Sequence, residues 1–570
     1  MTVSEGVEAA PPARPRFGLK FDGWTAFALA IAGLLAIPVL VVFAAVFTPA
    51  GEVWRHLADT VLSRYIFNTL VLALGVGIGT LVIGVGTAWL VSMCRFPGRR
   101  LFEWALFLPM AVPAYVLAYS YTGMFEFAGP VQSLLREIFG WARNDYWFPE
   151  IRSLGGAIAM LTLVFYPYVY LLSRAAFLEQ SICVLEVSRT LGCSATRGFF
   201  RVALPLARPA IVGGLALALM ETLGDFGTVD YFAVDTFTTG IFRTWFGLGD
   251  PGAAAQLAAI LTGFVFILIV VERLSRRGAR YHHTSSRYRS LPNYRLTGGR
   301  AGWAFIACAL PVFLGFVLPG FQLVVWAIQT MDQILTPDFG RLALHTVALG
   351  AGTAFISVLV ALILAYGMRL NRNSRVMPGA ARVAGMGYAV PGTVVAVGVL
   401  IPFAWFDNTI DAWMRASFGV STGLFLSGTL AAVCFAYIVR FLAVSLNTVE
   451  ASLAKITGSM DDAARSLGQT AFGALRRVHL PLMSGSLLTA ALLVFVDVMK
   501  ELPATLILRP FNFNTLAVRA YELASDEQLA EAAGPALAIL AAGIIPVVLL
   551  SRAIARARPG RSDPHGGDAK

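Results

Sequence analysis

Charged residues are scarce in this chain of 570 residues, of which only 14% are Asp, Glu, Lys or Arg and 57% are hydrophobic. A soluble globule of this length needs more polar surface than that composition provides. Lysine is the rarest cation and occurs at four positions only: Lys20, Lys455, Lys500 and Lys570. Because none of them follows a glycine, the chain has no P-loop with which to bind and hydrolyse ATP.

Cysteine and histidine are also too few and too dispersed to form a recognisable reactive centre. The five cysteines are odd in number and lack metal-ligand spacing, which argues against a disulfide framework and a zinc site. They are Cys94, Cys183, Cys193, Cys308 and Cys434. The six histidines are scattered, and no nucleophile motif is evident. We therefore expect no catalytic residue and no cofactor bound by this chain.

Hydrophobic residues, by contrast, gather in runs of about twenty, the length of a membrane-spanning helix. The chain is predicted to be an all-α polytopic membrane protein with about twelve spans in two halves. The first six are 25–47, 66–93, 101–125, 155–177, 207–227 and 254–271. The second six are 302–328, 342–368, 380–406, 422–446, 485–502 and 534–550.

Arginines gather in alternate loops and predict the orientation of these spans. A net charge of +11 can indicate nucleic-acid binding, but short arginine-rich loops beside apolar spans are better explained by the positive-inside rule. The first run lacks a small-residue cleavage site, so it is interpreted as an uncleaved helix. Both termini are then cytoplasmic. The opposite loops are mixed or acidic, with Asp230, Asp235 and Asp250 in one and Glu522, Asp526, Glu527 and Glu531 in another.

A linker with eight arginines and no acid, 273–300, separates the halves. The predicted organisation is a cytoplasmic lead (1–24), a first six-helix domain (25–272), the linker (273–300), a second six-helix domain (301–551) and a cytoplasmic tail (552–570).

Two polar stretches between spans repeat each other at a distance of 276 residues, namely EVSRTLGCSATRGFFRVALP from Glu186 and DAARSLGQTAFGALRRVHLP from Asp462. In both, a glycine lies six residues after the acid and a Leu-Pro pair ends the stretch. The match extends to Ala111-Val112-Pro113 and Ala389-Val390-Pro391, so the halves are parallel repeats of one orientation.

A single polar stretch of this kind is usually a solvated connecting helix. Duplication at fixed spacing favours a docking element instead. The acid near the helix start complements the helix dipole, and the alanines permit close approach. The glycine allows a sharp turn, and Leu-Pro marks the start of a second helix. The positions are Glu186, Val187, Ser188, Gly192 and Pro205, and Asp462, Ala463, Ala464, Gly468 and Pro481.

These residues resemble the "EAA" loop of inner-membrane permeases in binding-protein-dependent ABC importers: Glu-Ala-Ala, three residues, Gly, then Leu-Pro. The chain departs from it at Val187, Ser188 and Asp462. The resemblance implies a type I importer permease in a bacterial inner membrane, whose two loops dock on a dimer of ATPase subunits. ATP and Mg²⁺ would bind to those subunits, and a periplasmic binding protein would deliver the substrate.

Four carboxylates follow the repeated stretches at matching positions, namely Glu221 and Asp225 in the first half and Asp497 and Glu501 in the second. At 1.5 Å per residue, Glu221 lies roughly 24 Å beyond Pro205 along a helix, in the outer half of the membrane. Ionisable groups there usually face a cavity or a partner, which suggests a cation pathway between the halves. A structural alternative is that they cap helix ends and that Lys500 neutralises Asp497.

The segments from Glu221 and from Asp497 to Ala517 also resemble the ferric-iron branch of these permeases, so the implied cargo is Fe(III). Hard cations prefer oxygen ligands, and tyrosines are available at positions 115, 119, 121, 166, 168 and 170, although packing explains each of them alone. Related branches carry thiamine, polyamines, sulfate or molybdate. Two other classes stay open: a twelve-helix secondary transporter, which would not need the docking loops, and a membrane enzyme, which would need a catalytic cluster.

Overall fold

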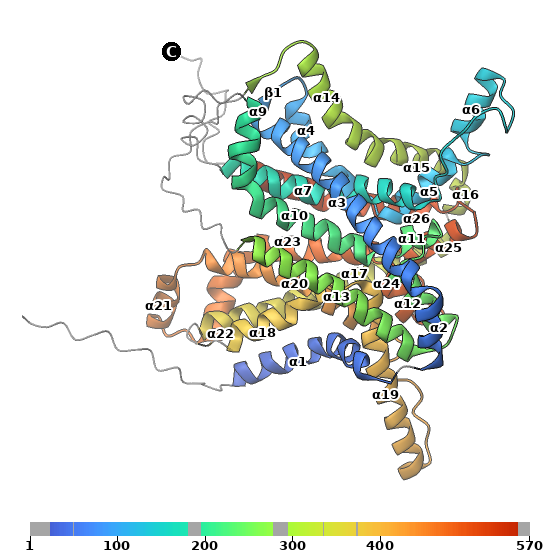
Figure 1. Cartoon of the computed structure of the whole chain (residues 1–570). Helices are drawn as coiled ribbons and strands as arrows, with labels where there is room; N and C mark the ends of the chain where they lie inside the picture. Colours follow the sequence, from blue (N-terminus) through green and yellow to red (C-terminus); the bar gives the residue numbers. More distant parts are fainter. Residues whose placement is uncertain are drawn as a thin grey trace, which may run out of the picture.

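The computed structural model describes residues 23–49, 51–179, 195–276, 294–334, 336–371, 374 and 376–556, and these are almost entirely helical (Figure 1). The elements of the first half are α1 (Gly23–Ala44), η1 (Ala45–Phe47), α2 (Glu52–Thr60), α3 (Leu62–Met93), β1 (Cys94–Arg95), α4 (Arg99–Ala105), η2 (Leu108–Ala111), α5 (Ala114–Phe125), α6 (Pro130–Phe139), α7 (Leu154–Glu179), α9 (Ala195–Gly198), η3 (Phe199–Ala203), α10 (Leu204–Gly224), α11 (Gly227–Tyr231), α12 (Phe237–Phe246) and α13 (Pro251–Arg276).

The second half repeats this order. Its elements are β2 (Tyr294–Arg295), α14 (Gly299–Val312), η4 (Phe313–Val317), α15 (Leu318–Gln329), α16 (Met331–Ile334), α17 (Pro337–Leu370), α18 (Val376–Ala384), η5 (Gly385–Ala389), α19 (Gly392–Phe418), α20 (Leu430–Ala454), α21 (Gly458–Ser466), α22 (Ala471–Ala474), η6 (Leu475–His479), α23 (Leu480–Lys500), α24 (Pro503–Leu508), α25 (Leu516–Ser525) and α26 (Ala533–Arg556).

Ten helical segments in the described ranges are long and apolar enough to cross a membrane, and they correspond to ten of the twelve predicted spans. The third predicted span is not one helix, because Arg99–Ala111 and Ala114–Phe139 meet at 90°. The twelfth corresponds to α26, whose apolar part in the described residues is Ala533–Ile545. The polytopic all-α architecture predicted from the sequence is confirmed.

The repeated Val-Pro pair explains the break in the third span. Val112 and Pro113 are both extended, with ψ of 122° and 141°, because a residue before proline is driven out of the helical region. Val390 and Pro391 do the same in the second half, so α19 begins at Gly392, later than the predicted start at Ala380. Each break places a chain turn midway through its half, where an open site can form.

The Leu-Pro pairs behave differently from the prediction that they start a new helix. Ala471–Lys500 is one continuous helical segment, and a π-helical turn, η6, accommodates Pro481 where α23 begins. The first half has the same π turn, η3, before Pro205. Proline has no N–H to donate to the preceding turn, and a widened turn absorbs that missing bond without ending the helix.

The internal duplication is visible in the helices themselves. α7 and α20 begin at Leu154 and Leu430, and α10 and α23 begin at Leu204 and Leu480, each pair 276 residues apart. α3, α7 and α10 pack together in the first half, as α17, α20 and α23 do in the second. This common offset lets residues from α7 to α10 be paired with their counterparts from α20 to α23.

The first span of each half packs on the other half. α1 lies against α18 and α19 of the second half. In the first span of the second half, α14 lies against α3 and α4 and α15 lies against α5, while α15 also contacts α26 of its own half (Figure 1). Accordingly, one buried cluster contains Ala304 and Cys308 beside first-half residues, and another contains Ala28 and Ala32 beside second-half residues. The domain boundaries drawn at the linker remain a sequence prediction, and the packing crosses them.

A two-residue parallel pairing of β1 with β2, with Cys94 opposite Tyr294, also joins the halves. The two regions that follow α7 and α20, marked by α9 and by α21 with α22, lie at the same side of the molecule, the left of Figure 1. The short helices α11, α12 and α25 lie toward the opposite side. The second polar stretch and the described end of the first, from Ala195, therefore lie toward one side of the molecule.

Candidate functional site: a carboxylate-lined cavity between the halves

A cavity of about 120 Å³ lies where α10 and α23 end, between the two halves. All four sequence-predicted carboxylates line it: Glu221, Asp225, Asp497 and Glu501. Two cations, Arg440 and Lys500, line it as well. With every group ionised, two negative charges remain unbalanced, so the cavity favours a positive occupant.

Glu221 and Asp497 lie near the last turns of α10 and α23, one from each half. Their side chains keep 27% and 28% of their surface exposed, so they are open to the cavity. Asp497 Oδ1 lies 3.5 Å from Lys500 Nζ, as the structural alternative anticipated. These two acids are the ones best placed to meet a solute.

The carboxylates of Asp225 and Glu501 accept hydrogen bonds from backbone amides. Asp225 accepts hydrogen bonds from the amides of Thr228 and Val229 at 3.1 and 3.2 Å, at the start of α11. Glu501 accepts from the amide of Ala504 at 3.1 Å, at the start of α24. Both carboxylates thus cap short helices, as the alternative interpretation anticipated for helix ends, while they also line the cavity.

Arg440, in the middle of α20, was not predicted. Its Nη1 donates to Glu501 Oε1 at 2.9 Å, and its Nη2 lies 3.9 Å from Glu221 Oε2. It therefore joins acids of both halves. An arginine inside an apolar span was a signal in the sequence, because buried charges in a membrane almost always have partners.

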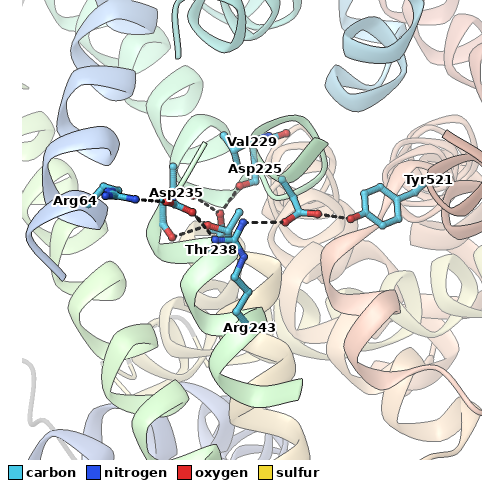
Figure 2. A network of polar contacts seen from close by, with 10 residues as sticks. Arg64, Asp225, Val229, Asp235, Thr238, Arg243 and Tyr521 are labelled. Atoms are coloured by element: carbon cyan, nitrogen blue, oxygen red, sulfur yellow. Dashed lines mark hydrogen bonds and ion pairs between the residues drawn. The ribbon is translucent and has the colours of Figure 1, made fainter. Parts of the chain in front are cut away.

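A second network of polar contacts holds α11 and the turn before it (Figure 2). Tyr521 of α25 donates to Asp230, while Arg243 of α12 pairs with Asp235. Burial and the neighbouring Asp230 raise the pKa of Tyr521, so the phenol stays protonated as the donor. Thr238 Oγ1 donates to the carbonyl of Asp225 at 2.7 Å. The network fixes the turn that carries Asp225 and ties it to the second half.

Of the six tyrosines considered as oxygen ligands, Tyr115 and Tyr168 line the cavity. A further tyrosine, Tyr388, also lines it. Tyr115 is buried, and its hydroxyl has no hydrogen-bond partner among the described residues. Tyr121 and Tyr170 instead donate to backbone carbonyls, those of Leu314 and Glu103. No three His, Cys, Asp or Glu side chains in the described ranges converge closely enough to hold a metal ion permanently.

The second polar repeat forms α21, with Asp462, Ala463 and Ala464 inside the helix. Ala464 is buried and Ala463 is exposed, and Asp462 pairs with Arg465 on the surface. Gly468 has φ of 76°, a left-handed conformation that ends the helix and favours glycine. The sharp turn expected at this glycine is therefore present.

The acid that anchors α21 is Asp461, one residue before the predicted one. Asp461 Oδ2 lies 2.8 Å from Arg369 Nη2, and Oδ1 lies 2.8 Å from His479 Nε2. Arg369 also donates to the carbonyls of Leu453 and Ile456. Since His479 lies at the base of the helix that carries Asp497, α21 is joined to the cavity through one continuous helix.

The first polar repeat lies mostly outside the described residues, and this includes Glu186, Val187, Ser188 and Gly192. Its end is described: Pro205 occupies the first turn of α10, after the π turn. Close to this end, Trp89 packs against Phe177 and Phe199.

Comparison with known proteins relates part of the chain to a transport family. Residues 80–280 match the family described as the binding-protein-dependent transport system inner membrane component. The matched region includes α7, the first polar repeat, α10 and the first-half wall of the cavity.

Whole-chain relatives extend the match to both halves. The chain is 27% identical over 530 residues to the Fe(3+)-transport system permease protein FbpB 2 of Haemophilus influenzae, covering 91% of this chain and 96% of that protein. It is 24% identical over 480 residues to the ferric transport system permease protein FbpB of Actinobacillus pleuropneumoniae, covering 80% and 66%. The molybdenum transport system permease protein ModB of Escherichia coli is 28% identical over 204 residues, 35% of this chain and 86% of that protein.

The molybdenum permease aligns with about one third of the chain, whereas FbpB 2 of Haemophilus influenzae aligns with it almost end to end. The family match and these relatives agree with the apolar spans and the duplicated helices in indicating a membrane transport protein. The chain matches the binding-protein-dependent transport family over residues 80–280, and it is a multi-pass inner-membrane permease component of an ABC importer.

Proposed function

We propose that this chain forms the membrane pathway of an ATP-driven importer of ferric iron. The observation that carries the proposal is the cavity between the halves, where Glu221, Asp225, Asp497 and Glu501 converge from both repeats. Carboxylate and phenol oxygens suit a hard cation such as Fe(III). The whole-chain relatives named as ferric permeases support the same cargo.

The charge of the cavity separates iron from the oxyanions. Four acids and two cations line it, so molybdate or sulfate would meet net repulsion. The molybdenum permease is similar to 35% of the chain only, which fits shared machinery rather than shared cargo. Thiamine and polyamines are cationic and remain the alternatives within this class.

The family match supports the partners that we propose. A periplasmic binding protein delivers the cargo, and two separate ATPase subunits bind ATP and Mg²⁺. The segments 186–205 and 462–481 dock on the ATPase subunits, with both chain termini on the same cytoplasmic side. Arginine-rich loops support this orientation through the positive-inside rule.

The chain's own residues would act in sequence. Closure of the ATPase dimer draws the two docking segments together, and α21 passes the movement through Asp461 and His479 to α23. The two halves then open toward the loaded binding protein, exposing Glu221 and Asp497. Since ATP must favour one state over the other, the switch depends on the docking contacts differing between states.

The proposal is tested in a bacterial strain that lacks its own iron importers and expresses the chain with its ATPase and binding protein. We expect accumulation of ⁵⁵Fe that requires the ATPase. Metal analysis of the captured binding protein should find iron. Uptake of labelled molybdate or thiamine without uptake of iron would contradict the cargo, and uptake that persists without any ATPase would identify a secondary transporter.

A further inference from the structure

The cations of the cavity come from the second half alone. With the offset of 276 residues, the acids match in kind, as Glu221 with Asp497 and Asp225 with Glu501, and so does Phe165 with Phe441. Arg440, however, corresponds to Val164, and Lys500 corresponds to Gly224. The two halves thus line the cavity with matching carboxylates, but only the second half contributes cations.

Arg440 is held by the second half and reaches toward the first. Its contact with Glu501, at 2.9 Å, is a close hydrogen-bonded pair, and Glu501 keeps only 4% of its side chain exposed. Its contact with Glu221 is longer, at 3.9 Å, and Glu221 is more exposed. The guanidinium therefore has one firm partner and one loose partner, which belong to different halves.

The backbone leaves room for this arrangement. A side chain at Gly392, where α19 begins after its proline break, would place Cβ 2.2 Å from Arg440 Nη1 and 2.6 Å from Glu501 Oε1. Those atoms cannot withdraw easily, because both are tied to each other. Gly392 is thus required for the ion pair to occupy the edge of the cavity.

We propose that Arg440 is an internal counter-cation of the pathway, which occupies Glu221 in the empty cavity and is displaced from it by a cationic cargo. The inference rests on the proposed cation transport. Four unbalanced acids would bind a trivalent ion too tightly to release it, whereas transport requires a site from which the ion can leave. A tethered guanidinium that returns to Glu221 competes with the cargo and promotes its release.

Terbium(III) provides a direct probe of this role. It is a hard trivalent ion that prefers oxygen ligands. Its luminescence is sensitised by nearby tyrosines, and Tyr115, Tyr168 and Tyr388 line the cavity. The experiment titrates Tb(III) into the full-length chain in detergent and follows sensitised emission for the wild type and for Arg440→Gln.

We expect Arg440→Gln to bind Tb(III) about tenfold more tightly than the wild type, because a like charge near the site is removed. Adding Glu221→Gln and Glu501→Gln should abolish the gain, which assigns it to this cavity rather than to surface acids. Val164→Gln is the matched control, since it places the same amide at the equivalent position on the other wall without changing charge.

Arg440→Lys covers the case in which Arg440→Gln does not fold. Lysine keeps the charge but offers a point charge that pairs with one acid, so it should free Glu221 and raise Tb(III) affinity about threefold. If both folded variants bind Tb(III) no more tightly than the wild type, Arg440 is not a counter-cation. Failure of the wild type to import iron would overturn the cargo instead, and the Tb(III) titration would still decide the role of Arg440.

Discussion

At the scale of single residues, the four carboxylates divide into two kinds. Asp225 and Glu501 cap α11 and α24 through backbone amides, while Glu221 and Asp497 make no such bonds within the described residues. The two kinds alternate in each half, four residues apart. Their roles can therefore be separated by mutation.

Asp225→Asn should destabilise the protein, because an amide is a poorer acceptor for the amides of Thr228 and Val229. We expect a loss of about 1 kcal/mol, the usual contribution of a helix cap. Glu221→Gln should leave stability unchanged and reduce cation uptake. Thermal unfolding in detergent, measured beside iron uptake, distinguishes them, and equal melting temperatures for both variants would refute the capping role.

Gly468 is the residue on which the turn after α21 depends. Its φ of 76° is strained for any residue with a Cβ, so Gly468→Val should cost more than the ~1 kcal/mol of a left-handed residue and displace the end of α21. We expect ATP-dependent uptake to fall while membrane insertion is normal.

Gly473→Ala is the control for that change, because it lies nearby in α22 with ordinary helical geometry. Normal uptake in Gly468→Val, measured at equal protein level, would show that the turn has no part in coupling.

The residue scale also shows what the sequence could and could not predict. The matched spacing of Glu221 with Asp497 identified the cavity acids, because symmetry carries over from sequence to space. Arg440 has no counterpart in the first half, so the comparison of repeats passed over it. Asp461 was missed because it adjoins the motif acid Asp462, and only folding shows which of the two neighbours turns inward.

At the scale of elements, Asp461 connects α21 with α17 and with η6 at the base of α23. Asp461 holds Arg369 of α17 on one side and His479 of η6 on the other. Arg369 keeps only 8% of its side chain exposed, so removing its acid leaves a buried charge poorly compensated. We expect movement of α21 to reach the base of the helix that carries Asp497 through this contact.

Asp461→Asn should uncouple the two helices. Breaking a buried ion pair typically costs 3–5 kcal/mol, and the neutral amide retains part of the hydrogen bonding, so we expect a loss of about 2 kcal/mol and a marked fall in uptake. Asp462→Asn is the matched control, because Asp462 is 68% exposed and its pairing with Arg465 is a surface contact of little energy. An equal effect of both variants on uptake would contradict the assignment of Asp461 as the anchor.

Element boundaries were predicted less well than element existence. Twelve apolar segments were evident from composition, but the 90° break at Pro113 and the π turns before Pro205 and Pro481 depend on how the neighbouring helices accept a missing N–H. Proline ended the helix at Val112 and not at Leu204. An apolar residue precedes proline in both cases, so tertiary packing decides whether the helix ends there.

At the scale of the whole molecule, two repeats share one site. Neither half alone supplies the cavity, since α10 and α23 each contribute its acids and only the second half contributes its cations. The first span of each half packs on the other, which ties the repeats together around the pathway. A relative movement of the halves must therefore change the separation of Glu221 from Asp497.

We propose that iron passes between the halves at Glu221 and Asp497. The most direct test of this proposal is ATP-dependent ⁵⁵Fe uptake by the Glu221→Gln, Asp497→Asn double variant, at matched protein and ATPase levels. Asp338→Asn, a carboxylate with 90% of its side chain exposed, is the control. We predict that uptake falls at least about tenfold in the double variant alone, because the cavity loses both solute-facing charges. Uptake at the wild-type rate would contradict the account.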